Sequence, residues 1–129
     1  MNNLAKRYIC EKVYNELELI AVKAGHCRYN YNCHKNAVHD ATINLDNYII
    51  CVISIQNNYH PYIHFLNIDN VGHYVDNTLG IHTLHNQHYF YKKINKSEFY
   101  NIDEIFIEIR KELRKSLPWY LRLFSNYEF

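Results

Sequence analysis

The sequence has little glycine and little proline, and this scarcity limits how the chain can be organised. Three glycines and two prolines in 129 residues leave no flexible or proline-rich tract that could act as a linker. There is also no internal repeat and no block of like charges. With 48% hydrophobic residues, the chain has enough apolar material for one sizeable core. We therefore expect a single folded domain over residues 1–129.

Long apolar runs and a strong charge of one sign are missing as well. The longest apolar run, residues 48–55, is too short to cross a bilayer, so no membrane partner is expected. The net charge is +1, which is low for a protein that neutralises phosphates, so no nucleic-acid partner is expected. No secretion signal is visible at the N-terminus, and we expect a cytoplasmic protein with reduced thiols. The cysteines are Cys10, Cys27, Cys33 and Cys51.

The spacing of the apolar residues predicts an α+β fold. Apolar residues at three- and four-residue steps indicate helices, and short apolar runs bounded by turn residues indicate strands. The expected helices cover 4–24, 33–41 and 103–116. The expected strands cover 48–55, 62–68, 73–78 and 88–94. We expect N-terminal helices on one side of a roughly four-stranded antiparallel sheet, followed by a C-terminal helix.

Polar residues and glycine predict where these elements end. Asn3 and Asn32 are the expected N-caps of the first two helices, and Gly25 is the expected end of the first. Turns are expected at Asn57-Asn58 and at a hairpin over 69–72. The aromatic tail, residues 119–129, is expected to pack back on the body because a bare aromatic patch would be sticky.

A thiol, an imidazole and a carboxylate follow one another in an order that suits nucleophilic catalysis. Cys33 opens the short second helix, where unpaired N–H groups and the helix dipole favour a thiolate and can face an oxyanion. His64 lies within a strand, and Asp76 lies across the next hairpin, within reach of an imidazole on the neighbouring strand. A thiol needs a base, and the base needs a group that orients it. We therefore assign Cys33 as nucleophile, His64 as base and then acid, and Asp76 as the orienting residue.

Each assignment has an alternative. His60 and His73 are close enough in sequence to replace His64, although strand parity favours His64. Asp76 fits equally well as a turn residue of the segment DNTLG, where it would accept backbone hydrogen bonds. A buried thiol, a hydrogen-bonded strand histidine and a hairpin aspartate would give the same pattern without catalysis.

The order of Cys33, His64 and Asp76 on a helix and an antiparallel sheet resembles the papain-like superfamily in its broad sense. That group includes papain-type proteases, small amidases, transglutaminases and arylamine N-acetyltransferases. The resemblance covers roughly residues 30–94, and the short chain matches the smaller amidase or transglutaminase-like forms better than papain itself. It implies a thiol hydrolase or acyl/amide transferase that forms a thioester, needs no cofactor and acts on a protein, a peptide or a small amide or acyl compound. It also implies an oxyanion site before Cys33, where Asn30 or Asn32 stands in place of the glutamine of papain-like enzymes.

Other readings of the sequence compete with this one. The same fold could be a non-catalytic interaction module that uses its aromatic tail and loops as a surface.

A zinc site is not expected, because the cysteines and histidines lack the usual ligand spacing. The residues considered for it are His26, Cys27, Cys33 and His34, and a second histidine group is His82, His85 and His88. The one local cluster of tyrosine and lysine suited to nucleic acid is Tyr89, Tyr91, Lys92, Lys93 and Lys96.

Overall fold

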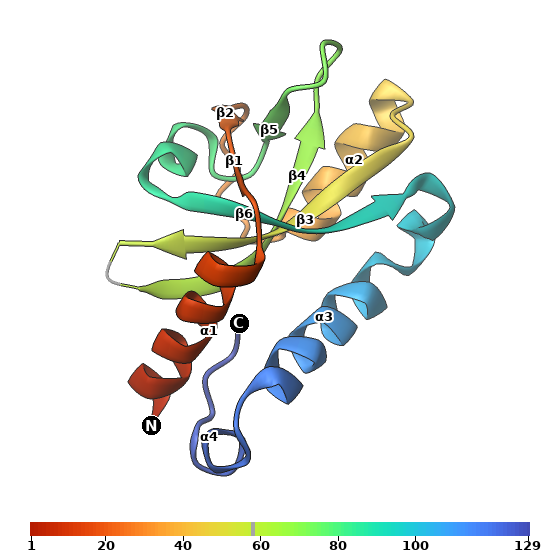
Figure 1. Ribbon diagram of the computed structural model, residues 1–129. Helices are drawn as coiled ribbons and strands as arrows, with labels where there is room; N and C mark the ends of the chain where they lie inside the picture. Colours follow the sequence, from red (N-terminus) through yellow and green to blue (C-terminus); the bar gives the residue numbers. More distant parts are fainter. Residues whose placement is uncertain (58) are drawn as a thin grey trace.

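The computed structural model describes residues 1–57 and 59–129 as one sheet with helices packed against it (Figure 1). The helices are α1 (Asn2–Glu16), α2 (Cys33–Asn44), α3 (Ile102–Ser116) and α4 (Trp119–Phe124). The strands are β1 (Leu19–Ile20), β2 (Val22–Ala24), β3 (Tyr48–Gln56), β4 (His60–Ile68), β5 (Tyr74–Asp76) and β6 (Gln87–Asn95). Short 3-10 helices follow β5 and β6, at Gly80–His85 and Lys96–Asn101. The expected turn at Asn57-Asn58 includes a residue outside the described ones.

The sheet contains the expected antiparallel strands and two more. Its order is β1-β6-β3-β4-β5-β2. The four strands β6, β3, β4 and β5 are antiparallel neighbours, as the sequence predicts. At the edges, β1 pairs antiparallel with β6, and β2 pairs parallel with β5. The sheet is therefore six-stranded and mixed, which corrects the expectation of about four antiparallel strands.

The two unexpected strands come from the second half of the expected helix over 4–24. That helix ends at Glu16, and Leu17 has an extended backbone. The apolar spacing over residues 19–24 is compatible with a helix. In the structure these residues instead form backbone hydrogen bonds with β6 and β5, which a longer α1 would not make. The expected ends were wrong too, because α1 begins at Asn2, which places Asn3 inside the helix. Gly25 is not a helix stop: its N–H donates to the Asp76 carbonyl at 2.9 Å, and a Cβ there would lie 2.1 Å from Asn77 Oδ1.

The sheet curls until its two edges meet. The edge strands β1 and β2 stand at opposite ends of the strand order, yet only Ala21 separates them in sequence. Two Cα steps span at most about 7 Å, so the end of β1 at Ile20 and the start of β2 at Val22 lie within that distance of each other. A small apolar cluster lies on the face enclosed by this curl. It consists of Ile50, Val52 and Leu66, with Ile20, Val22 and Phe90 among the residues packed on it.

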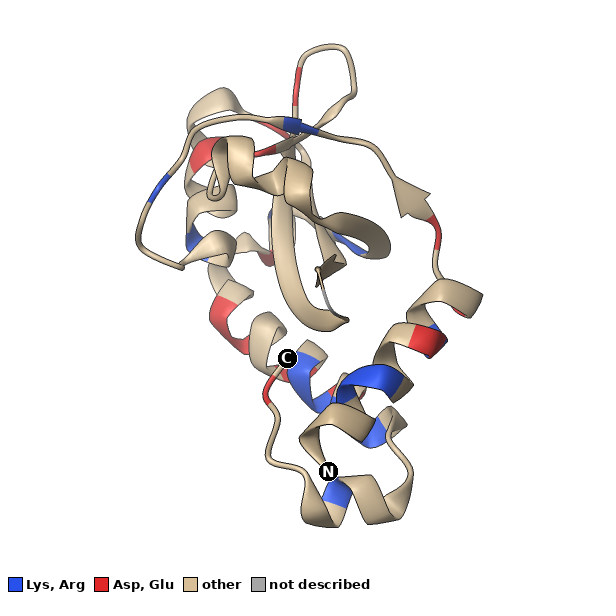
Figure 2. Cartoon of the chain, turned by 90° about the vertical axis from the view of Figure 1, so that its left-hand side faces the viewer, with Lys and Arg blue, Asp and Glu red and all other residues tan. Residues whose placement is uncertain are grey.

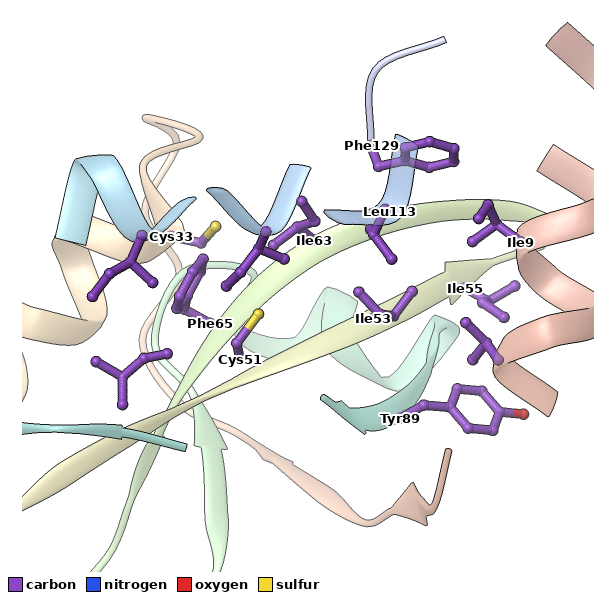
Figure 3. Close-up of a cluster of buried hydrophobic side chains, with 14 of the residues drawn as sticks. Ile9, Cys33, Cys51, Ile53, Ile55, Ile63, Phe65, Tyr89, Leu113 and Phe129 are labelled. Carbon is purple, nitrogen blue, oxygen red and sulfur yellow. The ribbon is translucent and has the colours of Figure 1, made fainter. Parts of the chain in front are cut away.

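The other face of the sheet carries the main core, which all four helices cover. Cys51, Ile53 and Phe65 contribute from β3 and β4 (Figure 3). Ile9 of α1, Ala37 of α2 and Leu113 of α3 pack on these strands, and α4, which lies against α1, adds Leu121 to the same cluster. The helices therefore share one side of the sheet, as expected. No helix in residues 1–57 or 59–129 is long and apolar enough to cross a membrane.

The aromatic tail packs back on the body only in part. The Ile63 N–H donates to the carbonyl of Phe129 at 2.8 Å, and Leu121 and Phe129 are buried in the core. Trp119, Leu123 and Phe124, however, are 64%, 69% and 67% exposed. The expectation that the tail packs back on the body is therefore met at Leu121 and Phe129 and not on the outer side of α4.

Replacing Cys51 with alanine is expected to destabilise the protein by about 1–3 kcal/mol, because the thiol fills space in a close-packed core. Cys51 is 0% exposed and lies between Phe65 and Ile53 (Figure 3). The matched control is Cys27→Ala, since Cys27 is exposed. Urea unfolding of both variants measures the difference. Equal midpoints for the two would show that Cys51 does not contribute to core packing.

Candidate active site

Polar bonds on the buried side of α2 fix the position of Cys33. The helix begins at Cys33, as predicted, but the side chain of Asn32 does not cap it. Asn36 Nδ2 donates to Thr78 Oγ1 at 3.0 Å, and Asn67 Nδ2 donates to the Ala37 carbonyl at 2.8 Å. These bonds join α2 to β4 and to the segment after β5. They place the helix start beside the strands that carry His64 and Asp76.

His64 and Asp76 form a buried hydrogen-bonded pair. His64 Nε2 lies 2.7 Å from Asp76 Oδ2, and the two side chains are 3% and 0% exposed. The second carboxylate oxygen, Oδ1, accepts the N–H groups of Thr78 and Leu79, each at 2.9 Å. Burial on its own would raise the pKa of Asp76, but the bond to His64 and these backbone bonds lower it to about 2. Asp76 therefore does both things expected of it: one carboxylate oxygen bonds to the imidazole of His64, and the other accepts backbone N–H groups of the turn.

The Cys33 thiol lies near His64, which affects its pKa. Burial would raise the pKa of Cys33, but hydrogen bonding to His34 and to His64 outweighs it and lowers the pKa to about 6. Burial would likewise lower the pKa of His64, whereas its bonds to Asp76 and Cys33 raise it. Because Asp76 occupies Nε2, Nδ1 is the ring nitrogen of His64 that is free to face the thiol. The charges favour a thiolate beside an imidazolium at neutral pH.

His34 is a second imidazole at the same thiol, and the sequence reasoning considered it only as a metal ligand. His34 Nε2 lies 2.8 Å from Asp103 Oδ1, at the start of α3. Its ring stacks on Phe106, with centroids 4.8 Å apart and planes 16° apart. Hydrogen bonding to Cys33 raises the pKa of His34 against the effect of burial, and Asp103 adds to the rise. Only the fold could reveal this pair, because Asp103 lies 69 residues further along the chain.

The two histidines considered as alternatives to His64 have other partners. His60, on β4, packs against the Tyr127 ring, and His73 is exposed beside Asp69. Neither of these alternatives to His64 is hydrogen-bonded to Asp76 in the structure.

His88 is buried behind the candidate site. Its Nδ1 bonds to Ser54 Oγ at 2.7 Å and its Nε2 to Thr83 Oγ1 at 2.8 Å. The His88 ring lies 6.1 Å from that of His64, and burial lowers the pKa of His88. An uncharged His88 at this distance is compatible with a charged His64. Of the group His82, His85 and His88, only His88 is therefore a buried structural residue.

The two asparagines proposed for the oxyanion site have different surroundings. Asn30 and Asn36 bond to each other through both side chains, at 2.9 and 3.1 Å, and Asn30 Oδ1 also accepts the Asn32 N–H. The Asn30 amide thus helps to hold Asn36, and through it the start of α2. The Asn32 side chain is exposed. The assignment of Asn30 or Asn32 to an oxyanion site remains a prediction, and the N–H groups at the start of α2 are the other available donors.

No metal site emerges from the part of the chain that the structure describes. Three or more His, Cys, Asp or Glu side chains do not converge there in a way that could hold a metal ion. Within the set considered for zinc, Cys27 is exposed, and its backbone forms an isolated β-bridge with Leu79. Cys33 is buried at the start of α2. The four cysteines are free thiols. In the tyrosine and lysine cluster, Lys93 lies over the Tyr48 ring, 4.3 Å from its centroid.

Comparison with protein-family models, curated proteins and solved structures found no match for this chain. The resemblance to papain-like enzymes consequently rests on the order of the elements and on Cys33, His64 and Asp76 alone.

Alkylation of Cys33 by iodoacetamide is expected to be half-maximal near pH 6, because only the thiolate reacts and it predominates above the lowered pKa. The rate should be constant above neutral pH and fall as the thiolate is protonated in acid. His34→Asn and His64→Asn should each move the midpoint upward. Mass spectrometry of the Cys33 peptide separates it from the exposed Cys27.

The control is the same protein unfolded in urea, where the midpoint should approach the ordinary thiol value of about 8.5. A folded midpoint at that value would contradict the thiolate assignment.

Proposed function

We propose that the protein is a thiol hydrolase or acyl/amide transferase in which Cys33 is the nucleophile, His64 the base and acid, and Asp76 the orienting residue. The observation that supports this most directly is the 2.7 Å bond between His64 and Asp76, buried beside a thiol at a helix start. Burial of a charged pair is costly unless it is well bonded. A bonded pair next to a thiol of lowered pKa is typical of a catalytic site.

In the proposed reaction, the Cys33 thiolate attacks the carbonyl carbon of an amide or ester. A C–S bond forms, and the carbonyl oxygen becomes an oxyanion that N–H groups at the start of α2 can stabilise. The tetrahedral intermediate collapses with cleavage of the bond to the leaving group, which takes the proton of the His64 imidazolium. The product is a thioester on Cys33 and a neutral His64.

The second half-reaction restores the enzyme. Water or an acceptor amine attacks the thioester, and His64 takes the proton of this nucleophile. The C–S bond then breaks, and the thiolate and imidazolium are regenerated. Water gives hydrolysis and an amine gives transfer, so one site supports both reaction types. Asp76 keeps the imidazole ring in place in both halves and stabilises its charge.

A non-catalytic interaction module is the second candidate function. The observation that favours it is the exposure of Trp119, Leu123 and Phe124 on the outer side of α4. Large exposed apolar groups gathered at one place are typical of binding surfaces.

Cys33→Ala is expected to abolish the burst of p-nitrophenol that thioester formation releases from p-nitrophenyl acetate. The protein should stay folded, because the substitution removes one sulfur atom at a helix start. Cys27→Ala should keep the full burst, and acetylation should be found on Cys33 by peptide mass spectrometry. Turnover of Cys33→Ala at the wild-type rate would remove Cys33 from the mechanism.

Asp76→Asn is expected to lower activity far more than Asp69→Asn, with a loss of up to about 10⁴-fold by analogy with the same change in serine proteases. The two carboxylates are well matched, because each accepts two backbone N–H groups. Asp76 accepts those of Thr78 and Leu79, and Asp69 accepts those of Val71 and His73. Only Asp76 also bonds to His64.

Burst rates are to be measured beside circular dichroism and urea unfolding, since both variants should lose some stability. Equal losses of activity in the two would make DNTLG a structural turn and leave His64 without an orienting residue.

A further inference from the structure

We propose that one end of the molecule docks on the surface of an anionic lipid bilayer. This docking end comprises the exposed side chains of α4 and of the last turns of α3. Its apolar residues are Trp119, Leu123 and Phe124, and its basic residues are Lys111, Lys115 and Arg122. The proposal is independent of catalysis by Cys33.

The apolar residues of the docking end project from a helix that is firmly held. Leu121 turns inward and is 2% exposed, whereas Trp119, Leu123 and Phe124 are 64–69% exposed. Arg114 Nη2 donates to the carbonyls of Arg122 and Ser125, each at 2.7 Å, and Ser125 Oγ donates to Asn2 Oδ1 at 2.7 Å. The exposure therefore belongs to an ordered element that shows its most apolar side to solvent.

The charge around these apolar residues is basic. Lys and Arg gather at the lower end of the molecule in Figure 2, near the chain's N-terminus. Within the described residues, Lys111, Lys115 and Arg122 form no ion pair. The nearby acidic side chains are engaged elsewhere, Glu112 with the Tyr91 hydroxyl and Glu128 with Arg110. A chain with a net charge of only +1 thus concentrates positive charge at one end.

This combination fits an anionic bilayer better than an acidic protein. Tryptophan, phenylalanine and leucine insert into the boundary between headgroups and acyl chains, while lysine and arginine bind the phosphates beside it. α4 also lies at the tip of the molecule, far from α2 (Figure 1). A projecting tip suits a deformable bilayer, whereas a protein partner would need a matching hollow. The expectation of no membrane partner considered only spanning segments and does not cover contact of this kind.

The fluorescence of Trp119 tests the proposal directly, because it is the only tryptophan in the chain. The full chain is titrated with vesicles of phosphatidylcholine, with and without phosphatidylserine. With phosphatidylserine present, the emission should shift to shorter wavelength and acrylamide should quench it less. Pure phosphatidylcholine should give a much smaller shift, and added salt should reverse binding to the anionic vesicles.

Variants separate the two parts of the docking end. Lys115→Gln and Arg122→Gln should each weaken vesicle binding about fivefold, because each basic side chain near an anionic surface contributes to that extent. Leu123→Ser should prevent the shift in emission. The matched control is Ile81→Ser, since Ile81 is 65% exposed but lies in the 3-10 helix after β5. It should bind vesicles like the wild type.

Three outcomes would overturn the proposal. One is the absence of any shift with anionic vesicles, and another is equal binding to neutral and anionic vesicles. The third is a shift caused by an acidic peptide such as oligoglutamate but not by vesicles, which would make the partner a protein. Because none of these measurements uses the thiol, their failure leaves the proposed function untouched, and loss of Cys33 activity leaves this proposal untouched.

Discussion

The buried carboxylate of Asp76 is the group on which the candidate site depends. It is 0% exposed and has three hydrogen-bond partners from two parts of the chain, namely His64 and the N–H groups of Thr78 and Leu79. An unpaired carboxylate at this depth would be severely destabilising, so these bonds must all be made together. They hold β4 and the end of β5 in a single arrangement. The start of α2 is bonded to the same segment through Asn36 and Thr78, which brings Cys33 near enough to His64 for the histidine to lower the pKa of the thiol.

The sequence predicted the parts of the fold that depend on local patterns. The unbroken apolar run over 48–55 predicts a strand buried on both faces, and the periodicity over 103–116 predicts a helix with one buried face; the structure has β3 and α3 there. His64 and Asp76 come together for a related reason: strand parity and the hairpin at Gly72 put both side chains on one face of β4 and β5. Residues 19–24 could not be predicted, because their strands form only by pairing with β6 and β5, about 50 to 70 residues away. The His34–Asp103 pair was missed for the same reason, since it requires α3 to lie beside α2.

The two faces of the sheet have different tasks. The face under the helices is almost wholly apolar and supplies the packing energy of the domain. The enclosed face combines a small apolar cluster with polar side chains such as Ser54, His64 and His88, whose hydrogen bonds are satisfied within the protein. A site between the start of α2 and β4 gains from this division, because α2 can be held tightly by the apolar side while its first turn meets the polar side.

The meeting of β1 and β2 across the curled sheet has a consequence for how the chain reaches and keeps its fold. Both strands come early in the sequence, but their partners β5 and β6 are made much later. Pairing over such separations costs a large loop entropy. We therefore expect β1 and β2 to join the sheet late, as the slow step of folding. Once joined, β1 covers His88 and Tyr89 of β6, and β2 covers Tyr74–Asp76 of β5, so these stretches of strand edge are closed to neighbouring molecules.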